Sequence, residues 1–152
     1  MIEFKTKVHM NHDTADMLAE LNLDAGGLVQ QVIDKSVIDW DLQYCPWETG
    51  TLAKSPYSVT AIGSGRVIYP GPYARYLYYG EVYGPNIPTF DDDSGIPTGW
   101  FSPPGQEKHP TGRPLQYSPD PNPLAGSYWF ERMKADHLQD IIDEAKKAVG
   151  GK

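Results

Sequence analysis

The chain has 152 residues, which fits one domain, and a domain of this length buries about 68–70% of its unfolded surface without metals or disulfides. Its net charge of −7 and its dispersed Lys and Arg residues argue against a broad phosphate-binding face. The single cysteine excludes an intrachain disulfide, and no segment has the apolar length of a signal peptide core or a membrane span, so we expect a protein made in the cytoplasm that stays outside membranes.

The first part of the chain is predicted to form a strand followed by helices. Apolar and polar residues alternate over residues 2–10, the period of a half-buried strand. Asp13 or Thr14 can then cap a short helix. Over residues 25–44 apolar positions recur every three or four residues until Pro46, which predicts a long helix. Its apolar stripe consists of Val29, Val32, Ile33, Val37, Trp40 and Tyr44.

A hairpin and a short helix are predicted next. Residues 52–62 and 67–69 have the composition of two strands, and Gly63-Ser64-Gly65 between them is a glycine turn. Residues 73–80 follow a proline and end on Gly80, as expected for a short helix.

A proline-rich arm follows over residues 84–123, which hold ten of the fourteen prolines. We expect this arm to be irregular, with strand character only in residues 113–118. It also carries aromatic residues such as Phe90 and Trp100, which disordered segments lack. Such residues favour burial, so we expect the arm to dock on a neighbouring subunit. Packing over its own domain is the alternative.

The last element is predicted to be a helix that begins after Pro123. Lysines near its C-terminal end complement the helix dipole. Its apolar stripe consists of Trp129, Phe130, Met133, His137, Leu138, Ile141, Ile142, Ala145 and Val149.

Few residues have the spacing that catalysis or metal binding requires. Asp91-Asp92-Asp93-Ser94-Gly95 lacks the twelve-residue spacing of a calcium loop, so a solvated acidic turn is the better interpretation. His9 and His12 have no third ligand nearby. Cys45 has no base beside it in the sequence, and we interpret it as a packed side chain. We expect no catalytic residue, metal or cofactor, and no enzymatic activity.

Six tyrosines lie within residues 69–83. They could form a core layer, an interface, or a platform on which sugars or bases stack. Each buried hydroxyl needs a partner, and six exceed what one small core satisfies. Because Tyr, Trp and Arg are enriched at interaction hot spots, we favour an interface. The predicted interface residues are Tyr73, Arg75, Tyr76, Tyr78, Tyr79, Trp100, Phe101 and Leu115.

Several segments resemble the minor capsid proteins of tailed phages and prophages, which are related to neck and tail-completion proteins. The most specific are the P-x-x-T-G-x-L step from Pro46 to Leu52 and the segment Pro72-Tyr73-Ala74-Arg75-Tyr76-Leu77-Tyr78-Tyr79-Gly80. Tyr44-Cys45, Ser55, Val67-Ile68-Tyr69 and Ala125-Gly126-Ser127-Tyr128-Trp129-Phe130-Glu131 add to the resemblance, which covers residues 25–148.

The resemblance implies a single α+β domain spanning residues 1–152, with a small antiparallel sheet packed against two long helices and the irregular arm beside them. It also implies a structural virion protein in the neck, where a ring, hexameric or dodecameric, joins the DNA-filled head to the tail. The expected partners are further copies of the chain, a head-closure or adaptor protein, and a tail terminator or tube protein. DNA is expected to pass through without sequence-specific binding.

Net acidity suits a channel for a polyanion, so we expect Asp91, Asp92 and Asp93 to face the channel or its rim. One alternative is a tail terminator or tail-completion protein at the top of the tail tube. Another is a carbohydrate-binding module or phage hydrolase that stacks sugars on the tyrosines and Trp100.

Overall fold

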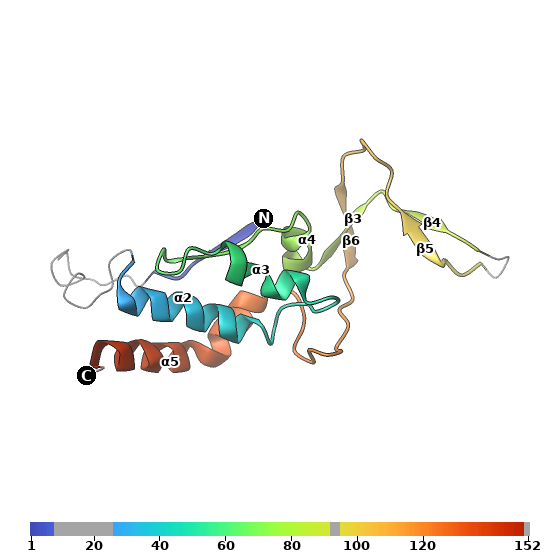
Figure 1. The fold of residues 1–152 in the computed structure, drawn as a ribbon. Helices are drawn as coiled ribbons and strands as arrows, with labels where there is room; N and C mark the ends of the chain where they lie inside the picture. Colours follow the sequence, from blue (N-terminus) through green and yellow to red (C-terminus); the bar gives the residue numbers. More distant parts are fainter. Residues whose placement is uncertain (8–25, 92–94, 151–152) are drawn as a thin grey trace.

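Two helices that lie side by side build much of the core in the computed structural model, which describes residues 1–7, 26–91 and 95–150. Helix α2 spans Leu28–Asp41 and helix α5 spans Trp129–Gly150 (Figure 1). Val29, Ile33 and Val37 of α2 are buried in the same core as Met133 and Ile141 of α5. Both long helices predicted from the apolar spacing are confirmed.

A two-stranded antiparallel sheet belongs to the same core. Strand β1 (Ile2–Lys5) pairs with strand β2 (Arg66–Tyr69), so that Ile2 lies opposite Tyr69. Because side chains alternate along a strand, Phe4 and Val67 both point into the core, where they are 7% and 0% exposed. The rest of the strand predicted over residues 2–10, and the short helix predicted after Asp13, lie outside the described residues.

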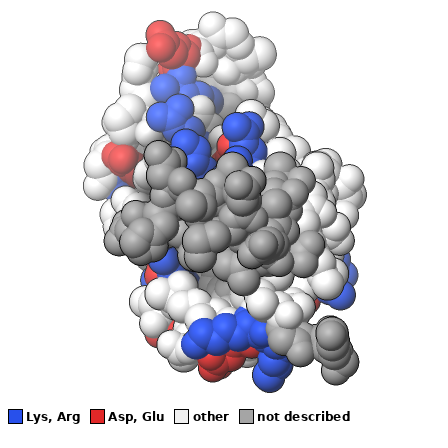
Figure 2. Space-filling view, turned by 90° about the vertical axis from the view of Figure 1, so that its left-hand side faces the viewer, with Lys and Arg blue, Asp and Glu red and all other residues white. Residues whose placement is uncertain are grey.

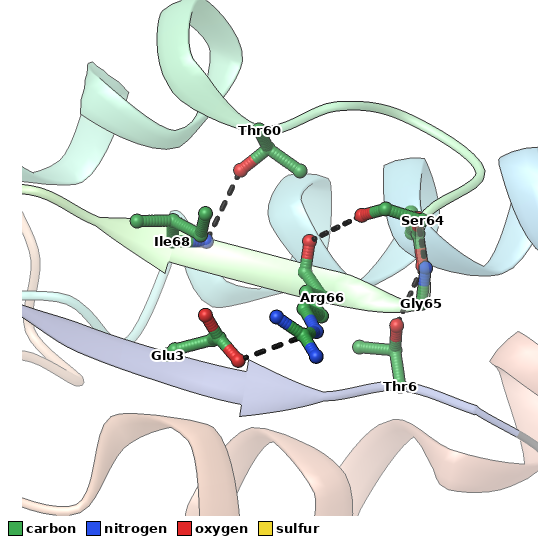
Figure 3. Close-up of polar contacts among 8 residues, drawn as sticks. Glu3, Thr6, Thr60, Ser64, Gly65, Arg66 and Ile68 are labelled. Carbon is green, nitrogen blue, oxygen red and sulfur yellow. Dashed lines mark hydrogen bonds and ion pairs between the residues drawn. The ribbon is translucent and has the colours of Figure 1, made fainter.

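The loop before β2 is fastened to the sheet by polar contacts, which Figure 3 shows at close range. The Thr60 hydroxyl accepts a hydrogen bond from the Ile68 N–H at 3.1 Å. The Thr6 N–H donates to the Gly65 carbonyl at 3.0 Å, which continues the pairing beyond β1. These bonds fix the loop and thereby the register of β2.

The buried carboxyl group of Asp34 on α2 forms hydrogen bonds with the same loop. Asp34 is fully buried and accepts four hydrogen bonds. The donors are the Thr6 hydroxyl at 2.5 Å, the Gln30 side-chain amide at 2.8 Å, and the backbone N–H groups of Gly63 and Gly65 at 2.8 and 3.1 Å. One side chain therefore joins α2, β1 and the loop into one unit.

The prediction of a hairpin strand over residues 52–62 is wrong, because helix α3 (Thr51–Val59) lies there. Ala53 and Pro56, three residues apart, are buried on one face. Pro56 has no N–H to donate to the Leu52 carbonyl. The Ser55 hydroxyl donates to that carbonyl at 2.7 Å instead, so the carbonyl still has a hydrogen-bond partner.

The predicted short helix is confirmed as α4, which spans Ala74–Tyr79. It ends at Gly80, whose φ of +72° is the left-handed conformation that glycine adopts readily. A Cβ at Gly80 would lie 2.8 Å from the Ser127 Cβ, so a side chain has no room there. The glycine thus ends α4 and lets the chain before α5 pass closely.

The arm contains regular structure that the sequence did not predict. Strand β3 (Glu81–Gly84) pairs with β6 (His109–Pro114), and β4 (Ile87–Thr89) pairs with β5 (Gly99–Phe101), both antiparallel. Figure 1 shows these two ladders extending away from the body, which consists of the helices and the sheet of β1 and β2. The predicted irregular arm is therefore a hairpin of two short ladders with irregular connections, and of the predicted strand residues 113–118 only Arg113 and Pro114 lie in a strand.

The described part of the chain has an α+β fold, with four helices and three two-stranded sheets. The sheet of β1 and β2 packs against the two long helices, as expected. In the same residues, no helix combines the length and the apolar character needed to cross a bilayer.

Candidate assembly surface

The outer ladder of the arm, formed by β4 and β5, exposes apolar side chains on both of its faces. Ile87 lies opposite Phe101, and Pro88 lies opposite Trp100. Residues that are opposite in a ladder share a face, and successive residues point to opposite faces. Ile87 and Phe101, 50% and 51% exposed, thus lie on one face, and Trp100, 58% exposed, lies on the other.

Two further large apolar residues flank this ladder at the outer end of the arm. Phe90 is 50% exposed and Ile96 is 68% exposed. Large exposed apolar groups gathered in one place are typical of interaction sites. A two-stranded ladder has little core of its own. The outer hairpin therefore has the surface of a segment that packs against something outside this chain.

The base of the arm, by contrast, is held firmly by the last turn of α4. Helix ends leave carbonyl groups without intrahelical partners. Here the Leu115 N–H donates to the Gly80 carbonyl at 2.8 Å, and the Tyr117 hydroxyl donates to the Leu77 carbonyl. On the other side, the Tyr128 N–H donates to the Tyr78 carbonyl at 2.8 Å. The arm is anchored at its base and exposed at its outer end.

The predicted tyrosine interface divides into exposed and buried parts. Tyr73 is 71% exposed and Tyr79 is 47% exposed. Tyr76 is half-buried, and its ring lies 4.4 Å from that of Tyr83. Tyr78 is only 3% exposed, so in this chain it is a core residue and its prediction as an interface residue is corrected.

Tyr78 is buried because of its position on α4. Ala74 lies one turn before it on the same face, and both point into the core. The Tyr78 ring meets Trp129 edge to face at 4.7 Å and Phe4 at 5.1 Å. Sequence spacing alone does not reveal this, because tyrosine is common on both the buried and the exposed face of a short helix.

The remaining predicted residues lie around the arm. Arg75 is exposed and forms no ion pair with a described residue. Leu115 is half-buried at the base of the arm, away from Trp100 and Phe101. Asp91 is exposed at the end of the outer ladder, whereas residues 92 and 93 lie outside the described part. A channel position for these aspartates stays a prediction, because it concerns an assembly.

Of the side chains weighed for chemistry, His9 and His12 lie outside the described residues, and Cys45 has a local packing role. Cys45 is buried, and desolvation raises its thiol pKa above the ordinary value. The His137 ring stacks on Trp40 with centroids 3.8 Å apart. Within residues 1–7, 26–91 and 95–150, no three His, Cys, Asp or Glu side chains gather as a metal site would require.

A groove of about 590 Å³ runs along α5 between α2 and the end of β1. Val29, Ile33 and Met133 contribute its buried floor. Leu138 and Ile142 on the α5 side remain 45% and 37% exposed. Sequence reasoning missed this groove, although Leu138 and Ile142 were among the predicted stripe residues of α5.

Lysines surround the groove. Lys5, Lys7, Lys134 and Lys146 line it, all four are exposed, and no Asp or Glu is among the described residues that line it. Figure 2 views the end of the molecule where α2 begins and α5 ends, and Lys and Arg side chains are more prominent there than Asp and Glu. In a chain of net charge −7, this is a local reversal of sign.

Comparison with known proteins gave no match to any family model, curated protein or solved structure.

Proposed function

We propose that this chain is a structural subunit of a tailed-phage neck, which assembles into a ring between the DNA-filled head and the tail. The observation that supports assembly is the outer hairpin of the arm. It is anchored at its base, extends away from the body, and exposes Ile87, Trp100 and Phe101 on its two faces.

The neck position rests on the sequence resemblance, whose residues have defined structural places. The step at Thr49-Gly50-Thr51-Leu52 leads into α3, and Gly50 has a φ of +76°. The tyrosine segment is α4 with its glycine end. These residues form α3 and α4, and the arm follows α4 directly in the chain. The resemblance and the arm therefore concern neighbouring parts of one fold.

Assembly is tested first with the purified full chain. Its mass is measured by light scattering over a range of concentrations, and particles are imaged by negative stain. We expect rings from the native chain and a monomer from the double variant Trp100→Ala with Phe101→Ala, because the variant removes apolar contact area from both faces of the outer ladder.

A matched control shows whether the effect is specific to the arm. Tyr57 and Ile62, 48% and 43% exposed, lie on the body, and Tyr57→Ala with Ile62→Ala removes similar exposed surface there. We expect the control to form rings like the native chain. A monomeric native chain at every concentration, or rings from the Trp100 and Phe101 variant, would contradict the proposed role of the arm.

The position in the particle is tested by imaging virions of the phage that encodes the chain. Density for this chain is expected between head and tail, in a ring of six or twelve copies. Density at the top of the tail tube would instead support a tail terminator. Glycan binding by the purified monomer, weakened by Trp100→Ala, would support the carbohydrate-binding alternative.

A further inference from the structure

The outer hairpin and the lysine-lined groove have complementary surfaces. The hairpin exposes Trp100 and Phe101, and the groove exposes Leu138 and Ile142 above a buried apolar floor. In the sequence, residues 87–101 hold three aspartates and no Lys, Arg, Glu or His. The groove is lined by four lysines and by no described Asp or Glu. Both the apolar and the charged parts of the two surfaces match.

We infer that the outer hairpin of one copy packs into the α2 and α5 groove of the next copy. This inference rests on the proposed ring and names the contact that would build it. Apolar side chains of the hairpin fill the groove, and Asp91 lies near its lysines. Opposite charges around an apolar contact steer association and fix its orientation.

The positions of the two surfaces show why the partner is another copy. Figure 1 shows the arm leaving the body at the end away from the start of α2 and the C-terminus of α5. The groove extends along α5 as far as Val149, toward the opposite end. An arm that extends in this direction points away from its own groove, so the groove within its reach is that of a neighbour.

The contact is heterologous, because different surfaces of the two copies meet. Heterologous contacts repeat from copy to copy, and they form a closed ring when the rotation between copies closes. The inference also gives Asp91 a place in a contact between subunits. This differs from the channel or rim position expected from the net charge.

The test uses two variants of the full chain, each damaged on one surface. The hairpin variant carries Asp91→Lys with Trp100→Ala, and the groove variant carries Lys134→Glu with Leu138→Asp. All four side chains are exposed, so both variants are expected to fold, which circular dichroism checks. Each variant alone should associate at least about tenfold more weakly than the native chain and remain monomeric where the native chain forms rings.

The decisive measurement is the mass of an equal mixture of the two variants. The hairpin variant keeps an intact groove, and the groove variant keeps an intact hairpin, so one contact can form between them. We expect a dimer and nothing larger. Raising the salt concentration should weaken this dimer, because salt screens the attraction between Asp91 and the lysines.

Cross-linking places the contact directly. Phe101→Cys in the groove variant and Leu138→Cys in the hairpin variant should join in the mixture through a short bismaleimide. Cys45 does not compete because it is buried. A cross-link between the two copies supports the inference, and no cross-link between the cysteines introduced at positions 101 and 138 in a mixture that forms dimers overturns it.

The remaining outcomes separate this contact from the ring itself. Rings from either variant alone would overturn the hairpin and groove contact and leave the ring proposal standing. Two monomeric variants that form no dimer on mixing would also overturn it, as would protection of the groove by residues 8–25 of the same copy. A native chain that never associates would overturn both proposals.

Discussion

Replacing Asp34 by alanine should destabilise the body of the protein strongly. Its carboxyl group accepts hydrogen bonds from Thr6, Gln30, Gly63 and Gly65, and all of these bonds are buried. In Asp34→Ala the hydroxyl and the side-chain amide can turn toward other partners. The two backbone N–H groups are fixed by the loop and cannot.

The magnitude follows from those two backbone groups. A buried donor left without a partner costs about 1–3 kcal/mol, so the two together cost about 2–6 kcal/mol. Native domains of this kind have total stabilities of about 5–15 kcal/mol, so the loss is a large fraction. Both backbone N–H groups donate to one oxygen, Oδ2, so the acceptor oxygen kept in Asp34→Asn can still serve both, and we expect a smaller loss than in Asp34→Ala.

Urea unfolding followed by tryptophan fluorescence measures this loss, because Trp40 and Trp129 lie in or against the core. The control is Asp39→Ala on the same helix. Asp39 is exposed and accepts one hydrogen bond, from the Tyr57 hydroxyl at 2.6 Å. We expect the control to lose no more than about 1 kcal/mol. If Asp34→Ala costs no more than the control, the loop is not held by this carboxyl group.

Three further predictions concern the core and the turns. Burial raises the pKa of Asp41 from 3.8 to about 8, so the folded state holds a proton that the unfolded state releases. The free energy of unfolding should therefore fall as pH rises from about 4 through about 8. Asp41→Asn should remove this pH dependence, which urea unfolding at several pH values measures. Gly80→Ala should destabilise by about 1–3 kcal/mol in urea unfolding, more than Gly112→Ala, because both have positive φ but only Gly80 has close neighbours. Cys45 should react with a thiol reagent only in urea, and reaction in the native state at neutral pH would contradict its burial.

The helices with strong apolar periodicity could be predicted from the sequence. Residues 25–44 and the stripe after Pro123 each repeat over several turns, so local spacing determined them. The segment before β2 could not be predicted in this way. Thr51 to Val59 contains β-branched and aromatic residues and a proline, and the bond from Ser55 to the Leu52 carbonyl shows how the helix accommodates the proline.

The ladders of the arm were missed for a different reason. Their strands are three to six residues long, two of the four carry prolines, and β3 pairs with residues far along the chain, as Glu81 does with Pro114. No local pattern records such a pairing. Trp100 and Phe101, in contrast, stood out in a proline-rich stretch of the sequence, and both are exposed in the described chain; their role in an interface stays a prediction.

The groove depends on tertiary packing more than any other part of the candidate site. Its floor comes from α2 and α5 and its rim includes the end of β1, so its residues lie in three separate segments. The sequence showed only the apolar stripe of α5. The lysines that line it are dispersed in the sequence and gather only after folding.

The anchoring of the last turn of α4 determines how the molecule responds to tension. A pull on the arm passes through the bonds to Leu77 and Gly80 and, on the far side, through the bond from Tyr128 beside the start of α5. The two bonds from the arm to Leu77 and Gly80 share such a load, whereas the outer ladder can open one rung at a time. A stretched copy would therefore lose its outer hairpin first and keep its body folded.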